Sequence, residues 1–503
     1  MGGMKTLAKE TAIYGVSSIL GRFMNWCLTP MYTFVLATTG EVGEVTNIYA
    51  ITALLLVLLT FGMETGFFRF VNKNEEEEKT VYSTTLLTVG GVILLFTLLV
   101  VLFRNSVAGM FIQVSHPEYI PEYVCIMAIV VGLDAFSAIP FAYLRYKKKP
   151  LQFAGIKLVF ILLNIAFNLF FLLLCPWMAT TEYAYLIEWF YRPDYGVGYV
   201  FVANLLATFL QTLFLVPHFT GFRYTFDFNL LRRMLSYSLP LLLLGIAGIM
   251  NQSFDKMMMP YLIDPSNDPM GQLGIYGTSV KIAVVLTMFT QAFRYAYEPF
   301  IFGRNKQEGK NSNSSYAEAM KYFIIVSLFL FLAVSFYLDL LKYLIKETYW
   351  EGLGIVPIVM AGTIFMGIFF NLSLWYKLND ETRWGAWFSL LGFAFIVSIN
   401  TLFVPTYGYT ACAWAIFISY LVMMLASYII GQKRYPIQYN MKSAGSYTLV
   451  TALLFVIGMY APIDNIVLRL SFRSFLIILF IAYTIKHDLP LKEIPILNRY
   501  LKK

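Results

Sequence analysis

Residues 80–103 read TVYSTTLLTVGGVILLFTLLVVLF and contain no charged side chain. Lys79 bounds this run on one side and Arg104 on the other. A helix of about 20 apolar residues covers the hydrocarbon core of a bilayer, which is about 30 Å thick. A helix also satisfies all of its own backbone hydrogen bonds, as a segment inside lipid must. This stretch therefore predicts a transmembrane helix.

The same pattern recurs along the whole chain of 503 residues. Apolar residues make up 59% of the sequence and charged residues only 13%, roughly half of the charged share of a soluble domain. A membrane β-barrel would instead show alternating segments of about ten residues. We predict an all-α polytopic membrane protein with about 14 transmembrane helices. The expected spans are 11–35, 46–70, 80–103, 120–144, 151–175, 197–217, 235–262, 273–301, 319–340, 353–377, 384–404, 409–430, 443–461 and 466–486.

The placement of Lys and Arg predicts the orientation, because short cytoplasmic loops are enriched in both. Of the 37 Lys and Arg residues, 26 fall on the side of the N-terminus, six on the opposite side and five within spans. We therefore expect a protein of the cell inner membrane with both termini cytoplasmic. The four cysteines and three histidines are scattered, so the sequence predicts no metal site and no cofactor.

Short identities between the two halves indicate an internal repeat. The matching pairs are Met24-Asn25 with Met250-Asn251, and Ile48-Tyr49 with Ile275-Tyr276. Secondary transporters are commonly built from such repeats, with the substrate site between them. We predict an N-lobe of six helices at 1–220 and a C-lobe of six helices at 221–435. Residues 436–503 would add two further helices and an amphipathic cytoplasmic tail.

The predicted span 273–301 has a polar side and an apolar side. A charged group inside a span is costly and normally faces a wet cavity or a partner. At 100° per residue, Val285 and Leu286 fall on the apolar side. The polar sector, about 140° wide, holds Tyr276, Lys281, Thr287, Gln291, Arg294, Tyr295 and Glu298.

Other spans also carry polar groups at depth. The span 11–35 repeats the design, with Arg22 and Asn25 on one face. Lys157 lies close to the cytoplasmic end of its span, so we expect it to extend to the interface. The remaining buried polar candidates are Glu64, Asp134, Asn251, Asp255 and Lys256.

Several of these residues could have a purely structural role instead of a functional one. Arg294 and Glu298, four residues apart, are spaced to pair along their own helix. Asp255 and Lys256 would lock two helices together, and Glu64 would neutralise Arg22. Arg22 and Lys281 have no obvious local partner, which favours a functional role for both.

A lipid that carries a sugar on a pyrophosphate bears two or more negative charges, and these cannot cross the hydrocarbon core of the bilayer unaided. A cavity lined by Arg and Lys would replace the hydration of these charges. We expect the pyrophosphate and sugar to be bound by Arg22, Asn25, Asn251, Tyr276, Lys281, Gln291 and Arg294. The residues expected to couple an ion or to balance charge are Glu64, Asp134, Asp255, Lys256 and Glu298.

Several short motifs resemble a known family. They are Asp255-Lys256, Gly274-Ile275-Tyr276 and Lys281, together with the stretches 61–64 (FGME) and 68–70 (FRF). This pattern is similar to that of Wzx-like polysaccharide flippases of the multidrug/oligosaccharidyl-lipid/polysaccharide (MOP) exporter superfamily, and the helix count resembles a MurJ-like fourteen-helix layout.

The resemblance implies two lobes that open a central cavity alternately to each side. It also implies a polyprenyl-pyrophosphate-linked oligosaccharide as cargo, a precursor of capsule, O-antigen or exopolysaccharide, moved from the cytoplasmic to the outer leaflet. Membrane lipids, and a glycan polymerase or export machinery, would be partners. No nucleic acid partner is expected.

Two other functions compete with this one. A MATE-like drug/cation antiporter of the same superfamily would favour an acidic cavity, whereas the in-span charges here are nearly balanced. A membrane polysaccharide polymerase or ligase would usually expose a large outer loop, and no loop here is long enough. The sequence has no G-x-x-x-x-G-K-[ST] phosphate loop, so we predict a transporter rather than an enzyme, without ATP hydrolysis by that route.

Overall fold

The structure is a computed structural model of the chain. It describes residues 19–21, 23–24, 26–72, 77–221, 223–308, 313–379 and 381–488. Within these ranges, 13 helices are long and apolar enough to cross a membrane. The predicted all-α, polytopic fold is confirmed.

The candidate spans follow the predicted ones in order. Of the predicted span 11–35, residues 26–35 are helical. The 13 candidate spans are Thr39–Val71, Glu78–Leu102, Ile120–Tyr146, Pro150–Ala179, Gly198–Phe219, Phe228–Leu262, Pro269–Tyr295, Ser315–Phe336, Glu347–Leu378, Arg383–Tyr407, Tyr409–Arg434, Met441–Tyr460 and Ile466–His487.

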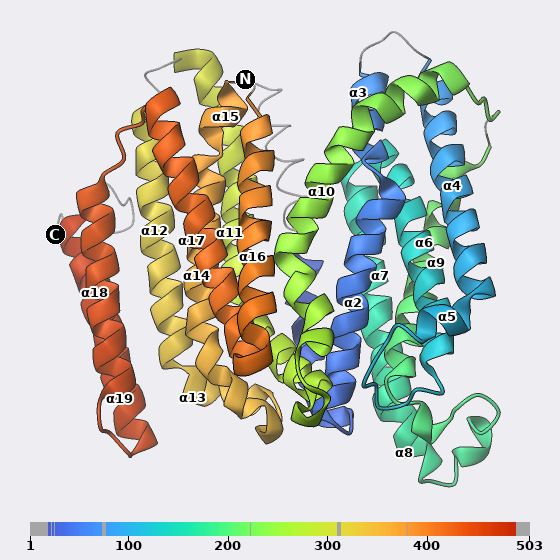
Figure 1. Ribbon diagram of the computed structural model, residues 1–503, viewed down its shortest axis with the longest axis horizontal. Helices are drawn as coiled ribbons and strands as arrows, with labels where there is room; N and C mark the ends of the chain where they lie inside the picture. Colours follow the sequence, from blue (N-terminus) through green and yellow to red (C-terminus); the bar gives the residue numbers. More distant parts are fainter. Residues whose placement is uncertain are drawn as a thin grey trace, which may run out of the picture.

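Figure 1 shows these helices as a bundle with two groups and an outlying pair. The first group comprises α2 (Thr39–Thr60), α3 (Met63–Val71), α4 (Glu78–Leu102), α6 (Ile120–Tyr146), α7 (Pro150–Leu169) and α9 (Gly198–Phe219). The second comprises α11 (Pro269–Glu308), α12 (Asn313–Phe336), α14 (Val356–Leu372), α16 (Arg383–Tyr407) and α17 (Tyr409–Arg434). We call the end where α2 and α11 begin the outer end, following the predicted orientation, and the opposite end the inner end.

Helix α10 (Phe228–Leu262) runs obliquely between the two groups in Figure 1. Near its start, Leu230 and Met234 are fully buried in a core that α3, α4 and α6 share. Near its end, Asn251 donates a hydrogen bond to the carbonyl of Ser389 in α16 at 2.8 Å. The helix therefore packs into the first group near its start and also contacts the second group further along.

A break separates α2 from α3, where Phe61 and Gly62 have φ of 33° and 73°. The left-handed conformation favours glycine. The backbone also passes close to α10 here, since a Cβ on Gly62 would lie 2.8 Å from the carbonyl oxygen of Ser238. Both constraints require a residue without a side chain.

The two groups pack most closely where α2 crosses α11 near the outer end. A Cβ on Gly43 would lie 2.0 Å from the carbonyl oxygen of Met270, and a Cβ on Gly274 would lie 2.0 Å from that of Thr39. Only glycine permits this approach of two backbones, as in membrane helix pairs with small residues at the interface. We call residues 39–46 and 270–277 the outer crossing.

The outlying pair is α18 (Met441–Tyr460) and α19 (Ile466–His487), which lie at one edge of the bundle in Figure 1. Arg473 of α19 is only 5% exposed. Its guanidinium donates to the carbonyls of Gly458 and Phe336 and lies 2.8 Å from the carboxylate of Asp339. These contacts fasten the pair to the outer end of α12.

Candidate functional site

Lys281 lies near the middle of α11 and is half-buried. The carbonyl of Lys281 accepts a hydrogen bond from the indole of Trp26 at 2.8 Å, so the first helix packs against α11 at this level. The same first helix contacts the other group through Tyr32, whose hydroxyl donates to Asn168 of α7 at 2.9 Å. Lys281 therefore lies where a helix bridges the two groups.

The ammonium of Lys281 has no hydrogen bond or ion pair with any side chain that the structure describes. A cation without a partner inside a membrane span is costly, even where it is only half-buried. Such a group is retained where an anion or water meets it during function. This agrees with the sequence-based expectation that Lys281 lacks a local partner.

Burial differs around α11. Ile282 and Leu286 are buried against the second group, whereas Gln291 is half-buried and Tyr295 is 37% exposed. Val285, placed on the apolar side by its angle, is also 37% exposed. The less buried residues of α11, Lys281, Val285, Gln291 and Tyr295, form a stripe that we call the uncovered stripe. It lies between the centres of the predicted polar and apolar sectors, because α14 and α12 cover only one side of the helix.

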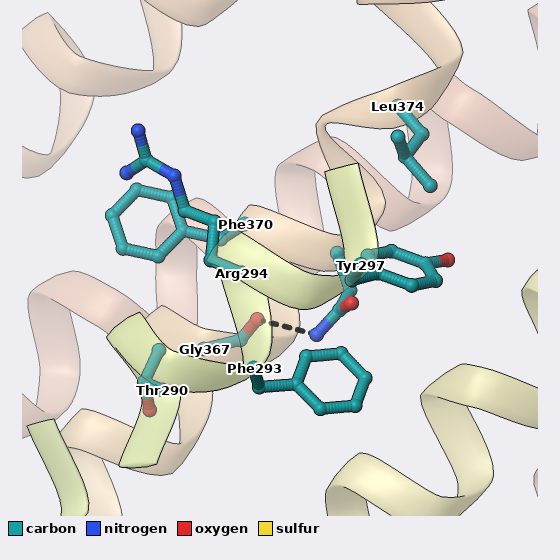
Figure 2. A pocket seen from close by; sticks show the side chains of 8 residues that line it. Thr290, Phe293, Arg294, Tyr297, Gly367, Phe370 and Leu374 are labelled. Atoms are coloured by element: carbon teal, nitrogen blue, oxygen red, sulfur yellow. Dashed lines mark hydrogen bonds between the residues drawn. The ribbon is translucent and has the colours of Figure 1, made fainter. Parts of the chain in front are cut away.

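Arg294 is exposed, and its guanidinium carbon lies 5.2 Å from the ring centre of Phe370 in α14. Figure 2 shows the guanidinium extending over this ring, while Tyr297 points to the opposite side of a small pocket. Inside the pocket Asn371 donates to the carbonyl of Gly367 at 3.0 Å. The pocket is mostly apolar and gives no sign of a site for an anion.

Arg294 follows Lys281 by 13 positions, which is roughly 20 Å along a helix at 1.5 Å per residue. The two cations therefore lie at different depths. A single pyrophosphate cannot rest midway in contact with both unless the side chains extend toward each other. The structure thus separates two residues that the sequence analysis grouped.

Three further candidates form one buried cluster in the outer half. Asp255 accepts a hydrogen bond from the hydroxyl of Tyr276, and the ammonium of Lys256 lies 3.2 Å from the same carboxylate. Asn47 of α2 donates to the carbonyl of Lys256 at 2.8 Å. The cluster ties α2, α10 and α11 together, which is the locking role considered for Asp255 and Lys256. Tyr276 is fully buried within it.

Asn251 is also buried, at 6% exposure, and its amide nitrogen is bonded to the carbonyls of Ala247 and Ser389. Its amide oxygen has no partner within the described ranges. The structure therefore places it between α10 and α16, where it fastens two helices, rather than on the uncovered stripe of α11.

Glu64 has a different partner from the one expected. Its carboxylate lies 2.5 Å from the guanidinium of Arg145 at the inner end of α6, and both side chains are about a third exposed. The proposed neutralisation of Arg22 by Glu64 stays a prediction, because Arg22 lies outside the described residues. Sequence spacing could not reveal this pair, since its members are 81 positions apart.

Asp134 lies inside the first group beside Lys157 of α7 and Gln211 of α9. The ammonium of Lys157 donates to the Gln211 amide oxygen at 3.4 Å and lies 4.2 Å from the ring centre of Phe141. The ammonium of Lys157 therefore contacts α6 and α9 from within the first group. The expectation that Lys157 extends to the interface stays a prediction.

Arg22, Asn25 and the side chain of Glu298 lie outside the described residues. No group of three or more His, Cys, Asp and Glu side chains within the described ranges is placed to hold a metal ion. The sequence analysis missed two buried carboxylates, Glu41 and Glu44, at the start of α2. Their spacing of three at the edge of an apolar run is a signal that was available.

The family model for polysaccharide biosynthesis proteins matches residues 7–302. No curated protein sequence matches the chain. Among solved structures, the lipid II flippase MurJ in an inward closed conformation has a TM-score of 0.74 at 11% identity, covering 94% of this chain and 99% of that one.

Multidrug transporters have the same fold. An inward-facing MATE family transporter of the MOP superfamily has a TM-score of 0.62 at 14% identity, covering 85% of this chain and 94% of that one. A mutant of the Vibrio cholerae MATE transporter VcmN has a TM-score of 0.61 at 14% identity, covering 86% and 98%. The predicted resemblance to this superfamily is confirmed.

Proposed function

The chain belongs to the family of polysaccharide biosynthesis proteins, and from this premise we propose that it is a flippase for a polyprenyl-pyrophosphate-linked oligosaccharide. The cargo would move from the cytoplasmic to the outer leaflet of the inner membrane. Both termini would be cytoplasmic, and the lobes at 1–220 and 221–435 would open alternately to each side.

The observation that carries this proposal is the ammonium of Lys281 beside Trp26, which has no side-chain partner among the described residues. Elsewhere in the spans, Glu64 is paired with Arg145, Asp255 with Lys256, and Asp134 lies beside Lys157. Within the described ranges, Lys281 thus adds a positive charge without a carboxylate partner at mid-depth, where the two groups of helices meet. A phosphate oxygen is the natural partner of such a charge.

The same charge argues against a cationic drug as cargo, although the fold occurs in MATE transporters. A positive group at the bridge between the lobes repels a cation and attracts an anion. The lipid tail of the proposed cargo would stay in the bilayer while the headgroup passes Lys281. Uncovered polar groups on α11, Gln291 and Tyr295, would bond to or stack on the sugars.

The proposal is tested in cells that lack the gene and carry plasmid copies of it. Lys281→Ala should lower surface glycan at least tenfold at an unchanged membrane level of the protein, whereas Lys281→Arg should retain export. Lys149→Ala, at an exposed position before α7, is the matched control and should export normally. Normal export with Lys281→Ala would remove the site, and normal surface glycan without the gene would remove the function.

A further inference from the structure

The start of α2, beside the outer crossing, carries two carboxylates that no proposed step has used. Glu41 is 5% exposed and Glu44 is 1% exposed. Both belong to the first two turns of α2, and a spacing of three places them on neighbouring positions of one helix face. Neither forms an ion pair with a Lys or Arg in the described part of the chain.

Backbone donors satisfy only part of these carboxylates. An oxygen of Glu41 accepts from the backbone N–H of Ala37 at 3.0 Å. One oxygen of Glu44 accepts from the backbone N–H of Ser115, and its other oxygen is buried without any hydrogen-bond partner among the described residues. A buried acceptor without a partner is destabilising, and more so if it is charged.

Among the described residues, the other titratable groups that face the pair supply no fixed positive charge. His116, in the loop before α6, is near Glu44, and its ring lies 3.3 Å from the exposed carboxylate of Glu118. Tyr123 of α6 faces both carboxylates, and Tyr349, in the 3-10 helix Glu347–Ile355, faces Glu41. Protonation of His116 would lower the negative potential at Glu44 without giving it a hydrogen bond.

We propose that Glu41 and Glu44 form a binding site for one monovalent cation, a proton or Na⁺, that is occupied while the outer crossing is closed. A proton on the free oxygen of Glu44 removes one of two like charges in a buried site. A sodium ion would instead bind both carboxylates, since hard cations take oxygen ligands. The inference rests on the proposed function in one respect, that the outer crossing opens during transport.

The loop before α6 links this site to α10, which also contacts the second group of helices. Its Ser115 is bonded to Glu44, and its Met110 carbonyl accepts from the hydroxyl of Tyr261 in α10 at 2.7 Å. A cation that neutralises Glu44 therefore stabilises the loop in the position that holds α2 and α10 together. Without the cation, the two carboxylates would repel each other, and this repulsion would favour the open state of the outer crossing.

The test uses the full chain in lipid nanodiscs with spin labels at Glu182→Cys and Asn267→Cys, two exposed outer positions on opposite sides of the crossing. Cys27 and Cys125 are replaced by Ser. The distances between the two spin labels report the ratio of molecules with a closed outer end to molecules with an open outer end. In potassium buffer the ratio should rise as the pH falls, by up to about tenfold per pH unit for one proton. For a sodium site the ratio should rise with NaCl at pH 8, and KCl should have no effect.

Glu44→Gln carries a permanently neutral side chain, so it should stay closed at every pH and ignore sodium. If it does not reach the membrane, Glu41→Gln tests the same pair and should lose most of the response. Glu118→Gln, an exposed carboxylate of the same loop, should respond as the parent does. A parent protein that responds to neither pH nor sodium, or a Glu44→Gln protein that responds as the parent does, overturns the site. The spin labels report the state of the outer end without any cargo. Export of glycan, measured separately in cells, therefore distinguishes failure of the cation site from failure of the proposed function.

Discussion

The outer crossing offers a direct way to prevent the proposed motion. A Cβ built on Gly277 of α11 lies 3.4 Å from the Cβ of Thr46 in α2. Disulfides join Cβ atoms about 3.5–4.5 Å apart and hold their Cα atoms within about 6.8 Å. Because the Thr46 side-chain atoms that would clash with the new Cβ are replaced by a single sulfur, Thr46→Cys with Gly277→Cys should form a disulfide with little movement of the backbone.

Once oxidised, this pair would fix α2 to α11 at the point of closest approach. If the crossing must separate in each cycle, export should fall at least tenfold and recover when a reductant is added. The assay is surface glycan in cells, with oxidation followed by a mobility shift on gels, in a background where Cys27 and Cys125 are Ser. The reduced double variant is its own control. If the fully cross-linked protein exported glycan as fast as the same double variant with its disulfide reduced, the proposal that the outer crossing opens would be refuted.

Three further predictions concern stability, each read from thermal unfolding of purified protein. Gly274→Leu should lower the free energy of unfolding by about 1–3 kcal/mol or more, because its Cβ meets a backbone oxygen that cannot move aside; an unchanged melting temperature would contradict the close crossing. Arg473→Met should cost about 1–3 kcal/mol, because it leaves the buried carbonyls of Gly458 and Phe336 without a donor, while Asp339 keeps Arg469 at 2.9 Å. Arg145→Met, in a pair that is a third exposed, should cost about 1 kcal/mol or less. A larger loss for Arg145→Met than for Arg473→Met would contradict this account of burial. Partial burial opposes ionisation of Asp488, but Lys321 at 2.7 Å holds the pKa of this carboxyl below its usual range. The stability that this pair adds should be fully present above about pH 4, the pKa of an unfolded Asp, and should fade as the pH drops through the pKa of the folded protein. The Asp488→Asn variant should lack this trend.

The sequence predicted the fold well because each span is a local property. Twenty consecutive apolar residues specify a membrane helix whatever surrounds them. All 13 candidate spans overlap predicted ones in the same order. The break at Gly62 was not predicted, since it depends on how closely α10 approaches.

The site was predicted less completely because contacts between helices are not local. Angles on a helical wheel gave the relative directions of Lys281 and Val285 but not which side other helices cover. Glu64 pairs with Arg145 from another helix, and no spacing rule reaches that far. Glu41 and Glu44 were missed because the predicted span began at 46, whereas α2 begins at Thr39.

The central claim is that Lys281 meets the phosphate of a lipid-linked glycan between two lobes. The most direct measurement is leaflet exchange of a fluorescent polyprenyl-pyrophosphate oligosaccharide in vesicles that contain the purified protein. We predict transfer by the parent protein and by Lys281→Arg, and transfer at the protein-free rate by Lys281→Ala. Equal transfer by Lys281→Ala and the parent, or accumulation of cationic dyes by a parent that leaves the lipid in place, would contradict the account.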